Sequence, residues 1–319
     1  MKAKFISELY PGDEITDFFL VKSIAVKTGS NGKNYLDMQL ADKTGDVYAK
    51  KWDASDEETS AAFLPKVGGI IKVRAQVTEW NGQRQMKVQK LRTAKPGDGL
   101  DVADFFRSAP RAPEEMYAYI EKTADSIDDE DFRIMTQRVL ADNRERLLYY
   151  PAAAKNHHAI HAGLLYHMTR MLEMAEKFCE VYGVLNRDLL VTGVIFHDME
   201  KLYEMAADEN GVVSDYTFEG ILLGHLVQGV VAIDRLAEEL QVPYEKKIML
   251  AHMVLSHHYE PEYGSVKKPL FPEAEALHYL DMVDSKLYDM ETALEGTTAG
   301  GFSDRVWTLD NRRIYKRQW

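Results

Sequence analysis

The chain has 319 residues, of which 45% are hydrophobic and 28% are charged, and its formal net charge is −12. This length predicts two domains, and the composition is that of a soluble globular protein. The longest apolar runs are interrupted by charge before twenty residues, the first residues lack a signal-peptide core and Cys179 is the single cysteine, so we expect a cytoplasmic protein with no membrane span, intrachain disulfide or thiolate-rich zinc site.

The negative charge is unevenly distributed along the chain. Residues 1–100 contain 16 Lys and Arg against 13 Asp and Glu, whereas the remainder contains 23 against 38. Because affinity for phosphate backbones rests largely on Lys and Arg, the first third is the part suited to a polyanion. A second basic patch follows near residue 319, and a solvated, poorly ordered terminus explains it equally well. It comprises Arg305, Arg312, Arg313, Lys316 and Arg317.

Residues from about 15 to 93 favour β-strands. Apolar and polar residues alternate in several segments, and turn residues such as Thr44-Gly45-Asp46 and Gly68-Gly69 separate them. The predicted strands are residues 18–26, 35–40, 46–52, 70–77 and 85–91. Five short strands in so few residues predict a small closed barrel, and residues 35–53 resemble the OB-fold modules that bind single-stranded nucleic acid.

Such a barrel would hold a single strand through charge and stacking. The cations predicted to follow the phosphate backbone are Lys50, Lys51 and Arg84, together with Arg74 and Lys87. The aromatic faces predicted to stack on bases are Tyr35, Trp52 and Trp80, although packing in the barrel core or rim explains any one of these rings equally well.

The pattern changes to a helical period after Lys95-Pro96-Gly97-Asp98-Gly99. We therefore expect a β and α multidomain chain: an OB-like barrel at 1–95, a linker at 96–103, an all-α bundle at 104–294 and a tail with a basic end at 295–319. The predicted helices are residues 114–122, 132–140, 164–182, 188–205, 220–240, 244–256 and 273–290.

His197 and Asp198 are adjacent inside an apolar run, residues 191–201. Burying an imidazole or a carboxylate without a partner is costly in free energy. This pair therefore indicates a bound cation that offsets the cost. Further candidates lie in or beside apolar helical patterns: His167, His225, His257, His258 and Asp281. Together they predict a two-metal hydrolytic site in which Asp198 bridges two ions and Lys201 aims its charge at a substrate phosphate.

Each candidate has a plainer interpretation when it is taken alone. Lys201 fits a solvent-facing lysine, His225 fits a satisfied core histidine, and the doublet of His257 and His258 fits a loop at a helix end. Asp284, one turn after Asp281, is predicted to support it from outside the ligand set, and the plainer interpretation is that both are acidic residues on the wet face of their helix. What weighs against these interpretations is the order along successive helices: His, His-Asp, His, His-His, Asp.

That order resembles the ligand order of HD-domain metallohydrolases with a binuclear centre. In addition, residues 157–167 are similar to the His-His-x-x-x-Gly-Gly-Leu-Leu-x-His block of YhaM-type 3'-to-5' exoribonucleases, with Ala162 in place of the first glycine. That family joins an N-terminal OB-like domain to a C-terminal HD domain. The resemblance therefore covers nearly the whole chain.

The resemblance implies two ligand sets and their surroundings. His167, His197, Asp198 and Asp281 would hold one ion, and Asp198, His225, His257 and His258 would hold the other. Lys201 and Asp198 would be catalytic, whereas His157 and His158 would contact the terminal phosphate or sugar, with structural packing as their alternative role. Nitrogen and oxygen donors favour manganese, iron, cobalt or magnesium over structural zinc, and the resemblance points to Mn²⁺.

The implied activity is metal-dependent release of nucleoside 5'-monophosphates from the 3' end of single-stranded RNA, with single-stranded DNA open as a second substrate. One alternative is an HD phosphohydrolase or phosphodiesterase acting on a small nucleotide, with the barrel as a sensor. Another is a non-catalytic nucleic-acid-binding adaptor. The sequence leaves formation of a homo-oligomer open.

Overall fold

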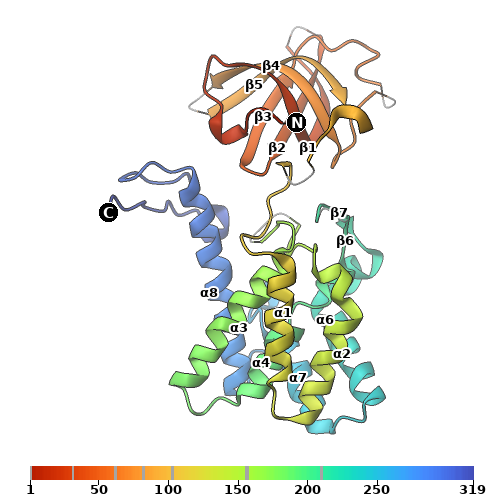
Figure 1. Ribbon diagram of the computed structural model, residues 1–319, viewed down its shortest axis with the longest axis vertical. Coiled ribbons are helices and arrows are strands. Elements are labelled where there is room, and N and C mark those ends of the chain that lie inside the picture. Colours follow the sequence, from red (N-terminus) through yellow and green to blue (C-terminus); the bar gives the residue numbers. More distant parts are fainter. Residues whose placement is uncertain are drawn as a thin grey trace. The chain divides into compact units, whose positions relative to one another are not determined.

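The computed structural model describes residues 2–30, 32–60, 63–80, 83–101, 104–154, 158–208 and 211–319 (Figure 1). The chain divides into two compact units, Met1–Ser108 and Ala109–Trp319. This boundary lies after the linker predicted at residues 96–103. Phe105 is buried with its ring 5.8 Å from Lys2 Nζ, and the Asp104 carbonyl accepts a hydrogen bond from Lys43 N. The residues just after the predicted linker therefore belong to the first unit, and position 104 is too early a start for the helical domain.

The first unit is a closed five-stranded barrel with the strand order β1-β2-β3-β5-β4. Its strands are β1 (Glu14–Thr28), β2 (Asn34–Asp42), β3 (Gly45–Lys51), β4 (Ile70–Trp80) and β5 (Gln83–Thr93). Neighbouring strands are antiparallel except β3 and β5, and β1 closes the barrel by pairing with both β2 and β4. This topology confirms the predicted OB-like barrel.

Alternation along the strands fills the barrel. Leu36, Met38 and Leu40 of β2 are at most 2% exposed, because every second side chain of a strand points to the same face. The short 3-10 helices η1 (Ile6–Glu8) and η2 (Pro96–Asp98) flank the five strands along the chain. Ile6 and Leu9 extend the same apolar core.

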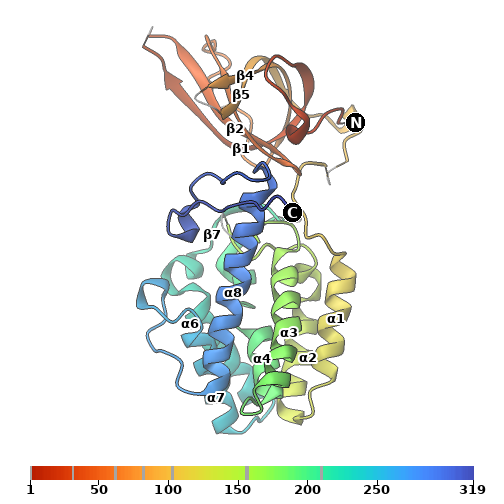
Figure 2. The same cartoon turned by 90° about the vertical axis from the view of Figure 1, so that its left-hand side faces the viewer.

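The second unit is a helical bundle with its own core (Figure 2). Its long helices are α1 (Pro113–Asp125), α2 (Glu130–Leu147), α3 (Gly163–Val181), α4 (Arg187–Phe196), α6 (Phe218–Glu239), α7 (Tyr244–Ser256) and α8 (Pro272–Glu295). The helix α4 contacts α3, α7 and α8, and its residues from Leu189 to Phe196 are all buried. A helix that is apolar on every side lies in the centre of the bundle.

One predicted helix is wrong in its extent. Residues 188–205 were expected as one helix, but α4 ends at Phe196, and a short helix, α5 (Lys201–Glu204), begins after a turn. The chain then enters an unpredicted two-stranded sheet of β6 (Met205–Ala207) and β7 (Val213–Tyr216). His197 and Asp198 therefore lie in a turn between two helices rather than along one helix.

Two further features bear on the sequence expectations. Among the described residues, α6 alone is long and apolar enough by composition to cross a membrane, which is weak evidence for a span because core helices pass the same test. After α8 and the 3-10 helix η4 (Pro261–Tyr263) that precedes it, residues 300–316 fold back on themselves. They include η5 (Trp307–Leu309), so the basic end is an ordered segment rather than a solvated tail.

Candidate metal centre

The structure gathers all seven predicted metal ligands in one buried cluster of the helical unit. His167 lies on α3, His225 on α6 and Asp281 on α8. The other four follow helix ends: His197 and Asp198 come after α4, and His257 and His258 come after α7. The cluster is thus assembled from five helices or helix ends.

The first half of the cluster surrounds His167 Nε2. This atom lies 3.3 Å from His197 Nε2, 3.4 Å from Asp281 Oδ1 and 3.8 Å from Asp198 Oδ2. His197 Nε2 is 3.3 Å from the same oxygen of Asp198. Two imidazole nitrogens and two carboxylate oxygens therefore converge on one point.

The second half of the cluster surrounds Asp198 Oδ1. His225 Nε2 lies 3.5 Å and His257 Nε2 lies 3.8 Å from this oxygen, and one nitrogen of His258 lies within 4.8 Å of the group. Among the described residues, Asp198 Oδ1, His225 Nε2 and His257 Nε2 are buried without a hydrogen-bond partner. Three orphaned polar atoms aimed at one point fit a cation, because buried polar atoms otherwise find partners.

Backbone carbonyls orient three of the imidazoles. His197 Nδ1 donates to Val194 O at 2.7 Å, and His257 Nδ1 donates to Val254 O at 2.8 Å. His258 Nδ1 donates to Tyr263 O at 2.8 Å. A carbonyl only accepts, so each Nδ1 carries the hydrogen and each Nε2 turns its lone pair to the cluster.

Carboxylates orient the other two imidazoles. Asp284 Oδ2 lies 2.7 Å from His167 Nδ1, and both oxygens of Glu204 lie 3.1 Å from His225 Nδ1. Such a carboxylate behind a ligating histidine fixes its tautomer and raises its basicity. Asp284 was expected in this supporting role from its place one turn after Asp281. Glu204 was missed, although its place one turn after Lys201 could have indicated it.

The pKa values of the cluster report excess negative charge. Burial alone would lower the pKa of His167, but its hydrogen bonds with Asp281 and Asp284 raise that pKa to about 9. Burial opposes ionisation of Asp198 as well, yet Lys201 and His197 hold the pKa of this carboxyl well below its usual range. A centre that keeps buried carboxylates ionised and draws positive charge to an imidazole is suited to divalent cations.

Lys201 lies where the sequence predicted it, beside Asp198. Its Nζ is 2.6 Å from Asp198 Oδ2, and its side chain is 12% exposed. Burial lowers the pKa of this ammonium, but Asp198 outweighs the burial and raises it, so Lys201 stays charged. The solvent-facing alternative for Lys201 does not hold.

The predicted substrate contact by His158 does not fit the structure. His158 is fully buried, its Nε2 lies 2.7 Å from Asp284 Oδ2, and its ring centroid lies 3.9 Å from that of Tyr288. It therefore packs behind His167, away from the side that faces the predicted ions. His157, which was predicted beside it, lies outside the described residues.

The barrel places some of its predicted contact residues on one groove. Lys50, Trp52, Trp80 and Lys87 line a groove of about 330 Å³, and Trp80 is 68% exposed. The Tyr35 and Trp52 ring centroids lie 4.5 Å apart, so Tyr35 packs against the indole.

Two of the cations predicted to contact the RNA backbone are engaged within the barrel. Lys51 is buried with its Nζ 2.8 Å from Glu58 Oε2. The Arg84 guanidinium donates to the carbonyl oxygens of Ile6 and Leu9 at 3.0 and 2.8 Å. Both side chains therefore serve the barrel itself, and alternation along the strand explains Lys51, whose position faces inward.

Comparison with known proteins gives three findings. The HD domain family model matches residues 164–287, which include all seven predicted ligands. The chain is 40% identical over 314 residues to the 3'-5' exoribonuclease YhaM of Geobacillus sp. strain WCH70, covering 98% of this chain and 95% of that protein. It is 38% identical over 307 residues to the 3'-5' exoribonuclease YhaM of Bacillus velezensis, with coverage of 96% and 95%.

The solved structures that match the barrel include an OB-fold domain. The second OB-fold domain of replication protein A from Methanococcus maripaludis matches 32% of this chain over its whole length, at 24% identity and a TM-score of 0.23. Because this score is low, the description of the barrel rests on its own strand pairing.

Proposed function

The chain belongs to the YhaM family of 3'-5' exoribonucleases, and from this premise we propose that it is a metal-dependent hydrolase that shortens single-stranded RNA from its 3' end. The observation that carries the proposal is the convergence of Asp198 Oδ1, His225 Nε2 and His257 Nε2, buried and unpartnered among the described residues. A nuclease of this family needs divalent ions, and these atoms fit one.

The chemistry of the donors supports the choice of metal. Five imidazoles and two carboxylates make up the cluster, and Cys179 lies apart from it on α3. Nitrogen and oxygen donors of this kind suit manganese, with cobalt, iron and magnesium as neighbours in preference. We therefore propose two Mn²⁺ ions, held by the two halves of the cluster with Asp198 shared.

When bound, divalent ions supply Lewis acidity, which activates water and stabilises charge on phosphate oxygens. Lys201 contributes a fixed positive charge at the edge of the cluster, where charge develops on the scissile phosphate. Its ion pair with Asp198 holds the ammonium in place at 2.6 Å. At His197, His257 and His258 the backbone carbonyls hold the proton on Nδ1, so Nε2 would be free to bind an ion.

The barrel groove is proposed to hold the RNA through its exposed indole rings and lysines. Stacking on Trp52 and Trp80 is tolerant of sequence and needs unpaired bases, so we expect weak sequence preference and little activity on duplexes. Cytoplasmic action is proposed on the sequence argument above.

The test uses the full chain, Mn²⁺ and one unstructured RNA labelled at either end. With the 5' label we expect a ladder of successively shorter products, and with the 3' label we expect release of a mononucleotide from the first time point. A chelator should abolish both. An endonucleolytic pattern, or no shortening with turnover of a small nucleotide instead, would contradict the proposal.

Variants link the activity to the cluster. Asp198→Asn should lower kcat by at least about 1,000-fold, because the shared carboxylate serves both ion sites. The matched control is Asp215→Asn, which makes the same change at an exposed position of β7 and should leave activity unchanged. Full activity in the Asp198 variant would place the hydrolysis elsewhere.

A further inference from the structure

The segment after α8 is an ordered hairpin with a strong charge contrast to its unit. Residues 301–319 carry five Arg and Lys against two Asp, whereas residues 109–300 carry 17 Arg and Lys against 34 Asp and Glu. A polyanion is repelled by most of the helical unit and attracted by this segment. The proposed function gives the hairpin no role.

Backbone pairing holds the hairpin together. Phe302 pairs with Tyr315 and Val306 pairs with Arg312 in antiparallel bridges. Lys316 Nζ donates to Leu294 O at 2.7 Å, which ties the hairpin to the last turn of α8, and Leu309 is fully buried. The segment therefore presents its side chains from a fixed backbone.

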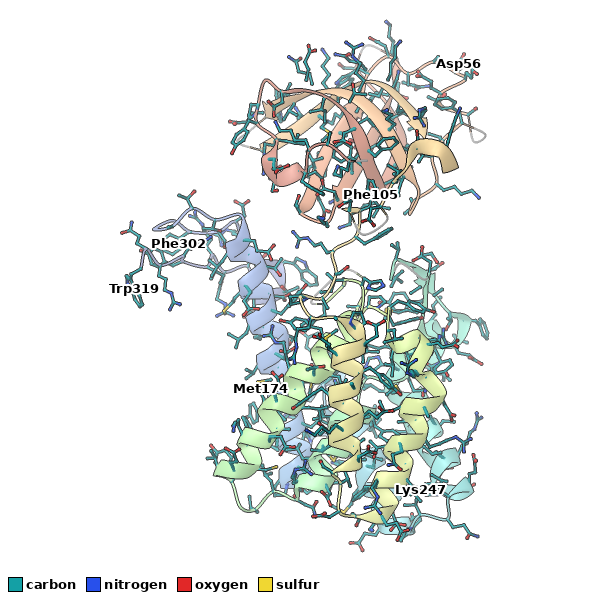
Figure 3. All side chains as sticks on the ribbon, in the orientation of Figure 1. Asp56, Phe105, Met174, Lys247, Phe302 and Trp319 are labelled. Carbon is teal, nitrogen blue, oxygen red and sulfur yellow. The ribbon has the colours of Figure 1, made fainter. Side chains whose placement is uncertain are left out.

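The second strand of the hairpin alternates between two faces. Exposure alternates from residue 313 to 317: Ile314 and Lys316 are half-buried, whereas Arg313, Tyr315 and Arg317 are exposed, and the following Gln318 and Trp319 are both exposed. Residues two apart on an extended strand share a face, so Arg313, Tyr315, Arg317 and Trp319 form a ladder of alternating guanidinium and aromatic groups. Figure 3 shows Phe302 and Trp319 projecting from the hairpin.

Rings and guanidinium groups contact one another within the ladder and between the ladder and Phe302. The Phe302 and Tyr315 ring centroids lie 5.2 Å apart, and the Arg313 guanidinium lies 5.5 Å from the Phe302 ring. The Arg317 guanidinium lies 5.1 Å from the Trp319 ring. Trp319 is 89% exposed, which leaves a face of its indole open to a base.

We propose that this ladder, Arg313, Tyr315, Arg317 and Trp319, is a second binding site for single-stranded RNA, which holds the part of the substrate 5' to the reacting end. Aromatic rings would stack on bases and guanidinium groups would contact phosphates, a combination that binds single strands without reading their sequence. The inference rests on the proposed function, because it takes the strand to end at the metal cluster.

Geometry sets the length of RNA that reaches the ladder. Asp281 and the end of α8 at Glu295 are separated by 14 residues, which is about 21 Å of helix. At about 3.4 Å per nucleotide of a stacked strand, this distance corresponds to roughly six nucleotides. Shorter RNA would occupy the cluster without touching the ladder.

The test compares long and short RNA on the full chain. Binding is measured by fluorescence anisotropy with a chelator present, using a labelled RNA of about 20 nucleotides, well beyond the roughly six needed. Trp319→Ala should weaken this binding about 5- to 150-fold, the loss of one stacked base. Arg317→Ala should reduce the slope of log affinity against log salt by about 0.7. With Mn²⁺ present, kcat/KM of both ladder variants for RNA of about four nucleotides should equal that of the wild type. Four nucleotides do not span the distance from the metal cluster to the ladder.

Two control variants make the same chemical changes off the ladder. Trp307→Ala removes an indole that is 70% exposed, and Arg305→Ala removes an exposed guanidinium of the same hairpin. Both should bind the long RNA like the wild type. Equal losses of RNA affinity in the ladder and control variants would overturn the ladder as a binding site. They would indicate that the hairpin attracts RNA only through its overall charge.

The remaining outcomes separate this inference from the proposed function. If the wild type shortens RNA but the ladder variants bind the long RNA unchanged, the ladder is overturned and the proposed function stands. If the wild type neither binds nor shortens RNA, both the ladder and the proposed function are contradicted. Binding of anionic lipid vesicles that depends on Trp319, with RNA binding that does not, would likewise overturn the ladder.

Discussion

At the scale of single residues, each imidazole of the cluster is oriented by the acceptor that its Nδ1 contacts. His197 and His257 each donate from Nδ1 to the carbonyl three residues earlier, so the end of a helix itself sets the ring. His167 and His225 sit within helices, where those carbonyls are already bonded, and they take a carboxylate instead. The two kinds of support predict different responses to mutation.

Asp284→Asn should weaken metal binding at the half of the cluster that contains His167. Loss of such a supporting carboxylate typically lowers metal affinity by about 10- to 100-fold. Titration calorimetry with Mn²⁺ measures this, and the expected result is one weakened site beside one unchanged site. The control is Asp289→Asn on the same helix, where the carboxyl interacts with Thr308 of the hairpin rather than with the cluster. Two unchanged sites in Asp284→Asn would show that this carboxylate does not support metal binding by His167.

Glu204→Gln should weaken the other half of the cluster. Glu204 accepts from both the backbone N and Nδ1 of His225, and an amide offers one acceptor oxygen where the carboxylate offers two. We expect the metal content after dialysis to fall from two ions per chain toward one, from an affinity loss of about 10- to 100-fold. Glu219→Gln, an exposed glutamate at the start of α6, is the control. A double variant of Glu204 and Asp284 that still retained both ions would contradict the supporting role of these two carboxylates.

At the scale of elements, the position of His225 depends on how α6 approaches α5. A Cβ at Gly220 would lie 2.1 Å from the carbonyl oxygen of Glu204, so the two helices touch through backbone. Four residues later Gly224 interrupts α6 with φ 66° and ψ 163°, a region essentially confined to glycine. This kink is what lets the His225 backbone N reach Glu204 Oε1 at 3.1 Å.

Gly224→Ala should therefore harm both stability and metal binding. The side chain has room, since its nearest neighbour would be Glu204 Oε1 at 3.6 Å, so the cost is conformational, about 1–3 kcal/mol. We expect a lower unfolding midpoint in urea and weaker binding at the His225 half of the cluster. Gly183→Ala, where the described residues leave open space around a Cβ and φ is not positive, should change stability by no more than about 0.5 kcal/mol. Equal effects of the two substitutions would mean that the kink carries no strain.

Several elements could be predicted from the sequence because one physical signal dominated there. Val47 and Ala49 alternate with polar residues along β3, and alternation of that kind has few other causes. Nothing in the sequence marks the end of α4 at Phe196, because Met199 and Leu202 continue the apolar pattern and are also buried. The clustering of the seven predicted ligands could be anticipated from the order of residue types. The burial of His158 was not, because periodicity says nothing of where a loop side chain points.

At the scale of the whole molecule, charge and chemistry are divided between two units. Residues 1–108 carry 17 Lys and Arg against 15 Asp and Glu, whereas residues 109–319 carry 22 against 36. Each unit has its own apolar core. All seven predicted metal ligands lie in the acidic unit, so the negative charge that would repel RNA is concentrated where bound cations reverse it locally.

Removing metal should consequently lower the stability of the helical unit only. A ligand that binds the native state alone stabilises it by about 2.7 kcal/mol when present at 100 times its Kd. For a unit the size of Ala109–Trp319, that free energy corresponds to a shift in Tm of about 5 to 11 °C. Differential scanning calorimetry with Mn²⁺ should resolve two transitions, of which a chelator lowers one by this amount. Trp80→Ala, in the barrel groove, identifies the other transition if it lowers that one alone. If the chelator lowered both transitions equally, the bound ions would stabilise the barrel as much as the helical bundle, which would contradict the prediction.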